Sequence, residues 1–265
     1  MPFNRVILLD LASFGFEKQS KSFNLQLIKM IQANQLPSLT RLGLFNILSN
    51  FCDVNSELTI NQNAIAGTVK VQTLSTHKTT GFREMFDFMI KYRAASLFEE
   101  VGKYTNTSII ARFANFLQTQ ENCEQIQVAN DAAAFSHVNT ILGKSDSGFI
   151  YAQLPDLRAA FKRNELEKAK AILIECDHQI QLILDQLLDN DLLIVTSSHA
   201  FNQSQSSIHR GQSYLPVMIS SPKFTHGKDL GIDNHPGSLG STVMDAFGFL
   251  DEVIDPLPSW LSSFK

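Results

Sequence analysis

The stretch that most constrains the fold is residues 191–200, D-L-L-I-V-T-S-S-H-A. Residues 192–195 are a run of large apolar side chains, long enough for a strand buried on both faces and too short for a helix. The run changes abruptly to small polar residues and reaches His199. Because ligands gather outside the carboxyl ends of strands in open α/β sheets, we expect a functional site here.

Other short apolar runs alternate along the chain with patterns of helical period. This alternation predicts a mostly parallel, doubly wound sheet in a three-layer α/β/α sandwich, formed by residues 1–265 as a single domain. Pro216 indicates either that its strand lies at an edge of the sheet or that the proline lies at the start of the strand. The predicted strands are 5–11, 107–111, 149–154, 192–195 and 214–220, and the predicted helices are 23–33, 130–142, 165–188 and 238–248.

Composition excludes several classes of partner. The net charge is −4 and basic residues do not cluster, so we expect neither nucleic-acid binding nor membrane binding. Cys52, Cys123 and Cys176 lie far apart without a metal-binding spacing, which is typical of free thiols in a reducing compartment. The first residues show no secretory signal pattern. A cytoplasmic protein is therefore expected.

Residues 52–83 are polar, rich in Asn, Gln and Thr, and predict a long loop. Within this region Thr79 and Thr80 precede Gly81 and a helix-like run over 82–92. Such an arrangement can direct a hydroxyl and backbone N–H groups at an anion. The alternative is that the two threonines only cap a helix.

Five segments together resemble a known family. Their order is similar to the core of the alkaline-phosphatase superfamily of metalloenzymes, and most closely to phosphopentomutases. Residues 78–155 are too few for the cap domain of that family, which implies that the cap is missing and that 93–130 could be its remnant. The segments are V-I-L-L-D-L-A-S-F-G (6–15), L-P-S-L-T-R-L-G-L (36–44), D-N-D-L-L-I-V-T-S-S-H-A (189–200), Y-L-P-V-M-I-S-S-P (214–222) and L-G-S-T-V-M-D-A-F-G (239–248).

The resemblance implies a site with two divalent ions, Mn or Zn, held by Asp and His, beside a Thr or Ser that accepts a phosphoryl group. In this chain the first-strand Asp is replaced by Ala12, with Asp10 two residues earlier. The phosphoryl acceptor falls on Thr76, Lys78 or Thr79, and the alignment favours Lys78.

The remaining ligand positions also depart from the family pattern. The second Asp falls on Leu157, or on Asp156 if the alignment slips by one residue, and the following His becomes Lys162. Near the end of the long apolar strand the Asp becomes Ser198 while His199 is retained. The last His becomes Arg210, or His209 with a one-residue slip.

These replacements lead us to expect no bound metal and a protein that is not an active mutase. The cationic side chains at these positions, Lys78, Lys162 and Arg210, would together repel a divalent ion. Such a site could still bind a phosphate or sulfate-type anion, because Lys and Arg do so without metal. The residues expected to contact this ligand are Ser13, Lys78, Lys162, Ser198, His199 and Arg210.

Two other functions remain open. The first is a metal-dependent phosphate-ester hydrolase or phosphotransferase that uses two divalent ions, with Thr79 or Thr80 as the catalytic hydroxyl. Its shifted metal ligands would be Asp10, Asp156, His199 and His209. The second is a structural subunit that binds a protein partner.

Two further carboxylates need an explanation. Asp10 lies inside an apolar strand, so it is either a structural hydrogen-bond acceptor or a remnant of the ligand set. Asp177 lies within the long predicted helix, where we expect it to hold a neighbouring loop.

Overall fold

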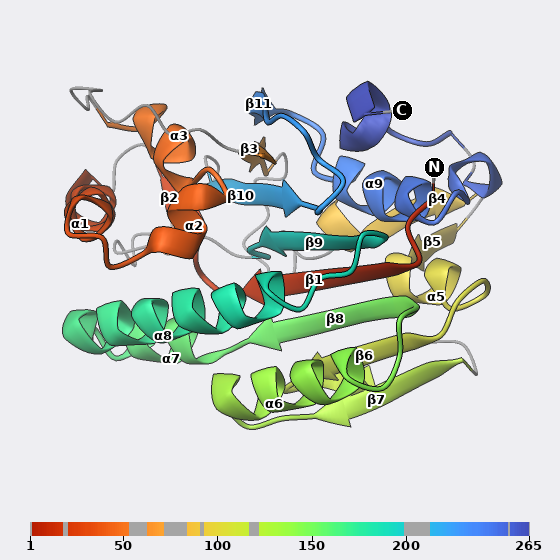
Figure 1. The fold of residues 1–265 in the computed structure, drawn as a ribbon, viewed down its shortest axis with the longest axis horizontal. Helices are drawn as coiled ribbons and strands as arrows, with labels where there is room; N and C mark the ends of the chain where they lie inside the picture. The colour runs from red at the N-terminus through yellow and green to blue at the C-terminus, as the bar shows by residue number, and fades with distance from the viewer. Residues whose placement is uncertain are drawn as a thin grey trace.

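A computed structural model of the chain describes residues 2–17, 21–52, 63–71, 84–90, 93–116, 122–198, 213–253 and 255–264. A twisted, mostly parallel sheet runs through the molecule (Figure 1), with strand order β11-β3-β10-β9-β1-β8-β6-β7, and β2 pairs with β10. The strands are β1 Arg5–Leu11, β2 Phe16–Glu17, β3 Ala64–Lys70, β6 Thr107–Ala111, β7 Cys123–Gln127, β8 Gly148–Leu154, β9 Asp191–Thr196, β10 Ser213–Ser220 and β11 Lys228–Asp233.

Strand β1 is the middle of this sheet. It pairs in parallel with β8 on one side and with β9 on the other, and all seven of its residues are buried. Side chains alternate between the two faces of a strand. Accordingly Ile7 and Leu9 enter one hydrophobic core, whereas Val6 and Leu8 enter the other.

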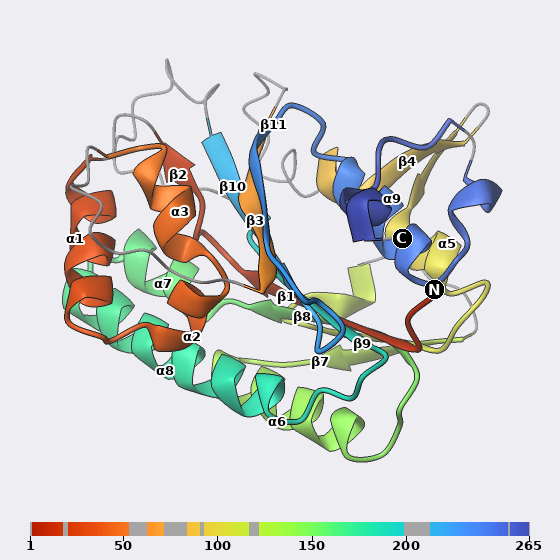
Figure 2. The ribbon, with the colours of Figure 1, turned by 45° about the horizontal axis from the view of Figure 1, so that its top comes forward.

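Helices cover both faces, which confirms the three-layer α/β/α architecture (Figure 2). One face packs against α1 Lys21–Gln32, α2 Pro37–Arg41, α3 Leu44–Ser49, α6 Asp131–Leu142, α7 Asp156–Lys162 and α8 Leu166–Leu184. The other packs against α5 Leu97–Val101, α9 Ser238–Ala246, the C-terminal 3-10 helix Trp260–Phe264 and residues beside the small hairpin of β4 Asp87–Ile90 and β5 Arg93–Ser96. The described residues form no separate cap domain.

Three details differ from the sequence predictions. Residues 64–70, expected within a long loop, form β3, which lies between β10 and β11. Residues 87–90, expected to be helical, form β4 of a two-stranded sheet. Residues 123–127, for which no strand is predicted, form β7, which pairs with β6 and extends the main sheet beyond β8.

The strand that contains Pro216 is also not at an edge, because β10 pairs with β3 on one side and with β9 on the other. Its pairing with β9 begins only at Val217, opposite Thr196, where β9 ends. Pro216 therefore lies one residue outside the part of β10 that pairs with β9. Its missing N–H removes no hydrogen bond between these two strands.

Asp177 on α8 binds a neighbouring segment, although that segment is the short helix α2 and not the loop that the sequence predicts. Its carboxylate accepts hydrogen bonds from the backbone N–H groups of Ser38 (3.1 Å) and Leu39 (2.7 Å) in the first turn of α2. A helix of five residues has no stable existence alone, so the cap and the packing against α8 define it.

None of the helices in the described part of the chain is long and apolar enough to cross a membrane.

A buried ion pair fixes the amino ends of the central strands. Arg5, only 1% exposed, donates to Asp191 from Nε (3.1 Å to Oδ1) and from Nη2 (2.5 Å to Oδ2). Its Nη1 donates to the carbonyl of Leu142, the last residue of α6, and to that of Ser145 just beyond the helix. The guanidinium thus links β1, β9 and α6 through contacts that compensate its burial.

We expect Asp191→Asn to lower the free energy of unfolding by about 3–5 kcal/mol, because it leaves the Arg5 guanidinium buried without a counter-charge. Urea denaturation followed by circular dichroism measures this change. The double variant Arg5→Met/Asp191→Leu should recover most of the loss, since it removes both charges together. A loss equal in the single and double variants would contradict the ion-pair explanation.

Candidate functional site

The carboxyl ends of β1, β8 and β9 lie side by side, at the edge where the sequence predicts a site. Asp10 on β1 is in register with Gln153 on β8 and with Thr196 on β9. Asp10 shares its strand face with Val6 and Leu8, so its side chain is on the α5–α9 side of the sheet.

Asp10, Tyr151, Gln153 and Ser198 form a hydrogen-bonded group that we name the Asp10 cluster. Asp10 is fully buried, and its Oδ1 accepts from the backbone N–H of Ser198 at 2.8 Å. Its Oδ2 accepts from the Tyr151 hydroxyl at 2.9 Å and from the Gln153 amide at 3.3 Å. A buried carboxylate requires such donors, and here it has three of them.

Burial among aromatic rings keeps the Tyr151 hydroxyl of this cluster protonated. The ring of Tyr151 packs edge-on against Phe86 and Phe98, with centroids 5.6 and 4.9 Å apart. Burial, and secondly the neighbouring charge of Asp10, raise the pKa of Tyr151 well above its ordinary value of 10.0. The hydroxyl therefore stays protonated and serves as a donor to Asp10.

Ser13 lies in the turn that follows β1. Its φ is 78°, a left-handed conformation that is unfavourable for a residue with a side chain, and it is 7% exposed. The next residue, Phe14, donates its N–H to the Ser197 hydroxyl at 3.0 Å. The turn after β1 and the turn after β9 are thereby joined, which places Ser13 and Ser198 at the same edge. Backbone strain of this kind often occurs at ligand-binding turns.

The other predicted ligand positions do not assemble around Asp10. Ala12, in the turn just after β1, has no metal-ligating atom in its side chain, and Leu157 is part of the hydrophobic core. Asp156 makes its hydrogen bonds with Asp131 instead. Lys162 is exposed in the last turn of α7, six residues beyond Asp156.

The donor set that the structure describes does not fit a dinuclear metal site. Within the described ranges, no group of three or more His, Cys, Asp or Glu side chains could hold a metal ion. Asp10 contributes the one carboxylate of its cluster, and that carboxylate is already hydrogen-bonded. The predicted positions Thr76, Lys78, Thr79, Thr80, His199, His209 and Arg210 lie outside the described residues.

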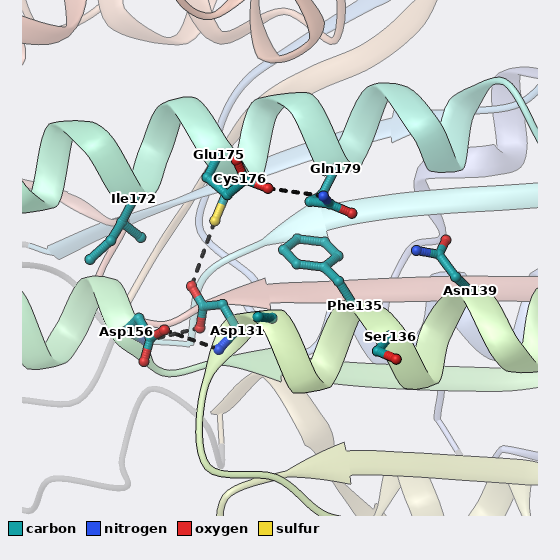
Figure 3. A pocket seen from close by; sticks show the side chains of 10 residues that line it. Asp131, Phe135, Ser136, Asn139, Asp156, Ile172, Glu175, Cys176 and Gln179 are labelled. Atoms are coloured by element: carbon teal, nitrogen blue, oxygen red, sulfur yellow. Dashed lines mark hydrogen bonds between the residues drawn. The ribbon is translucent and has the colours of Figure 1, made fainter.

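A second candidate site is a cavity of about 320 Å³ between α6 and α8, which we name the α6–α8 cavity. The first residues of α6 and α7 close one end of it (Figure 3). There Asp131 accepts from the N–H of Asp156 at 2.9 Å, and Asp156 accepts from the N–H of Asp131 at 3.1 Å. Each Asp thus caps the other's helix.

The rest of the lining comes from one face of each helix. Cys176 donates its thiol hydrogen to Asp131 Oδ2 with an S–O distance of 3.7 Å, and Gln179 donates to Glu175 at 2.9 Å. The residues that line the cavity are Asp131, Ala132, Phe135, Ser136, Asn139, Asp156, Ile172, Glu175, Cys176 and Gln179.

Sequence reasoning missed this cavity because its residues come from three elements that are distant in the chain. Nothing in the sequence around Asp131 or Cys176 indicates that the two side chains meet. Part of the signal was present, because Asp156 follows the predicted strand 149–154 by two residues. Asp131 likewise follows β7 by four residues, but that strand was not predicted.

Burial dominates the electrostatics of the cavity. It raises the pKa of Asp131 from 3.8 to about 7, partly opposed by the hydrogen bond from the N–H of Asp156 and reinforced by the charge of Asp156. Burial also raises the pKa of the Cys176 thiol well above 9.0, so Cys176 stays protonated and is a poor nucleophile.

Comparisons with known proteins agree with the resemblance. No family model matches the sequence. The phosphopentomutase of Clostridium kluyveri is 26% identical over 123 residues, which are 46% of this chain and 32% of that enzyme. The phosphopentomutase of Levilactobacillus brevis is 28% identical over 114 residues, 42% of this chain and 29% of that enzyme. The matched segment thus spans about a third of the length of these relatives.

Solved structures show the same fold. The lipoteichoic acid synthase LtaP of Listeria monocytogenes matches with a TM-score of 0.55 and 13% identity, over 92% of this chain and 72% of that chain. The alkaline phosphatase of the Antarctic bacterium TAB5 matches with a TM-score of 0.52 and 11% identity, over 93% and 99%.

The raised pKa of Asp131 predicts how stability depends on pH. The folded chain holds this proton more tightly than the unfolded chain, so the free energy of unfolding falls as pH rises from 3.8 to about 7. Between pH 5 and pH 8 the free energy of unfolding of the protein should fall by about 2–3 kcal/mol more than that of the Asp131→Asn variant. Urea denaturation of both proteins at the two pH values measures this difference; equal pH dependence would contradict it.

Removing the tyrosine hydroxyl of the Asp10 cluster should be costly. We expect Tyr151→Phe to lower the free energy of unfolding by about 1–3 kcal/mol, because the buried carboxylate loses a donor. Tyr104→Phe is the matched control, since Tyr104 is 39% exposed and its ring stacks on Phe249. Equal unfolding midpoints for the two variants would argue against the hydrogen bond to Asp10.

Proposed function

We propose that this alkaline-phosphatase-superfamily core, related in sequence to phosphopentomutases, has lost the dinuclear metal site and mutase activity. It acts instead as a binding or regulatory protein that recognises a small phosphate or sulfate-type anion. The observation that carries the proposal is the Asp10 cluster, in which the carboxylate nearest to the family's metal position is bound by protein donors.

Charge compensation supports this interpretation. A pair of divalent ions needs several anionic ligands, and Ala12 and Ser198 provide none at two of the inferred positions. Recruiting Asp10 to a metal would separate it from the Tyr151 hydroxyl and the Gln153 amide. The fully buried Tyr151 hydroxyl would then lose its hydrogen bond to the carboxylate, at a cost that opposes metal binding.

The location of Asp156 argues against the shifted ligand set. Asp156 and Asp131 cap each other's helices on the α6–α8 side of the sheet, whereas the Asp10 side chain is on the α5–α9 side. A metal that joined Asp10 and Asp156 would have to disrupt both arrangements. A hydrolase of this type therefore remains the alternative outcome of the experiments below, as does a subunit that binds a protein partner.

Anion recognition rests on chemistry that needs no metal. Hydroxyl groups, backbone N–H groups and basic side chains are sufficient to bind a phosphate ester. The strained turn at Ser13, which is 7% exposed, lies at this edge of the sheet beside the turn of Ser198, whose backbone N–H is bound to Asp10. Arg210 and Lys78 are the basic residues that the family alignment assigns to this edge.

The first experiment measures metal content and turnover. The protein is purified, exposed to Mn²⁺ and Zn²⁺, freed of excess metal and subjected to elemental analysis, and p-nitrophenyl phosphate is used as the substrate. We expect neither stoichiometric metal nor turnover. Two ions per chain, with turnover that disappears in His199→Ala, would overturn the proposal and establish a working metalloenzyme.

The second experiment measures anion binding by thermal denaturation in inorganic phosphate or sulfate, with chloride at equal ionic strength as the reference. We expect phosphate or sulfate to raise the melting temperature and Arg210→Ala to reduce that rise. Arg163→Ala is the matched control, because Arg163 is exposed just after α7. No rise, or an equal rise in both variants, would contradict anion recognition at this edge.

A further inference from the structure

The α6–α8 cavity contains only acidic groups among its charged residues. Of the described residues that line it, Asp131, Asp156 and Glu175 are acidic and none is basic. The cavity lies on the opposite face of the sheet from the Asp10 cluster, because α6 and α8 pack in the other hydrophobic core. A ligand there would therefore be distinct from the anion proposed above.

Asp131 is a buried carboxylate, 7% exposed, and no basic side chain of the described residues pairs with it. Its Oδ1 accepts one backbone N–H, and within the described part of the chain its Oδ2 accepts from the Cys176 thiol alone, at 3.7 Å. A thiol is a weak donor. A buried carboxylate needs a cation or several good donors: Asp191 is paired with Arg5, and Asp10 accepts from three donors, whereas Asp131 has one backbone N–H and a thiol. The remaining capacity of Oδ2 is therefore a place for a positively charged donor.

Apolar side chains form the rest of the surface that a ligand would meet. Figure 3 shows Phe135 on α6 and Ile172 on α8 on either side of the Asp131–Cys176 contact. Phe135 is 3% exposed. Gln179 and Asn139 add amide groups farther along the two helices. An acidic end beside apolar walls fits a ligand with one charged end and a compact hydrocarbon part.

We propose that the α6–α8 cavity binds a small organic amine, with the ammonium group paired with the Asp131 carboxylate and the hydrocarbon part against Phe135 and Ile172. The volume of about 320 Å³ accommodates a single ring with a short side chain. The pairing replaces the weak thiol contact at Oδ2 by a charge-assisted hydrogen bond.

Benzylamine and benzyl alcohol are suitable probes because they share a ring and differ in charge. Binding to the full chain is measured by titration in saturation-transfer difference NMR. We expect benzylamine to bind with a Kd of roughly millimolar order, and benzyl alcohol about tenfold more weakly. Equal affinities would overturn the proposal, since they would show an apolar contact only, and so would the absence of benzylamine binding.

Variants locate the binding. Asp131→Asn keeps the acceptor for the Asp156 N–H, so the cap persists, and should weaken benzylamine about tenfold while leaving benzyl alcohol unchanged. Asp146→Asn, at an exposed loop residue, is the matched control. Ser136→Trp at the exposed rim of the cavity should block both probes without removing a charge. Benzylamine binding that survives Asp131→Asn or Ser136→Trp unchanged would place it elsewhere and contradict the inference.

Discussion

A carboxylate buried in the middle strand of a sheet must be fully hydrogen-bonded, and this requirement organises one end of the protein. Asp10 has no solvent contact, so its donors must come from the neighbouring strands and turns. Tyr151 and Gln153 provide them from β8, and the backbone of Ser198 provides one from the turn after β9. The contact between Phe14 and Ser197 then joins the turns that follow β1 and β9. One buried charge thus explains the polar residues at the ends of three strands.

The two buried aspartates illustrate how the same physical requirement can have different consequences. Asp10 accepts from three donors of ordinary strength, whereas Asp131 accepts from one backbone N–H and one thiol. Desolvation is the leading cause of the raised pKa of Asp131, which shows that its charged form is poorly compensated by the protein alone. A satisfied carboxylate stabilises the fold, and an under-compensated one beside a cavity favours a ligand of opposite charge. This contrast is the physical basis for assigning a structural role to one aspartate and a binding role to the other.

The sequence predicted the elements whose signals are local. Strands β1 and β9 and the helix that begins after Asn130 follow directly from apolar runs and a capping residue, and the Asn130 side chain does accept from the N–H of Ala133. Strand β3 was missed because Asn, Gln and Thr dominate the composition of the region 52–83 in which it lies. The segment A-I-A-G-T-V-K (64–70) is itself strand-like. Pro216 was misplaced because only tertiary pairing shows that β9 ends opposite Val217. The sequence identified Asp10 as unusual, but its hydrogen-bond partners follow from the strand order, which no local pattern predicts. The α6–α8 cavity likewise depends on how two helices pack, which cannot be derived from either helix alone.

The fold does not depend on the side chains at the carboxyl ends of its strands, because its stability comes from interactions elsewhere in the sheet. The two hydrophobic cores run along the whole of β1, and the Arg5–Asp191 ion pair ties the strands together at their amino ends. None of these interactions involves Ala12, Ser13 or Ser198. Asp10, the carboxylate at that edge, is held by the neutral donors Tyr151 and Gln153 and by the backbone N–H of Ser198. The cores and the ion pair that hold the central strands together therefore place no charge requirement on the turns that follow β1 and β9.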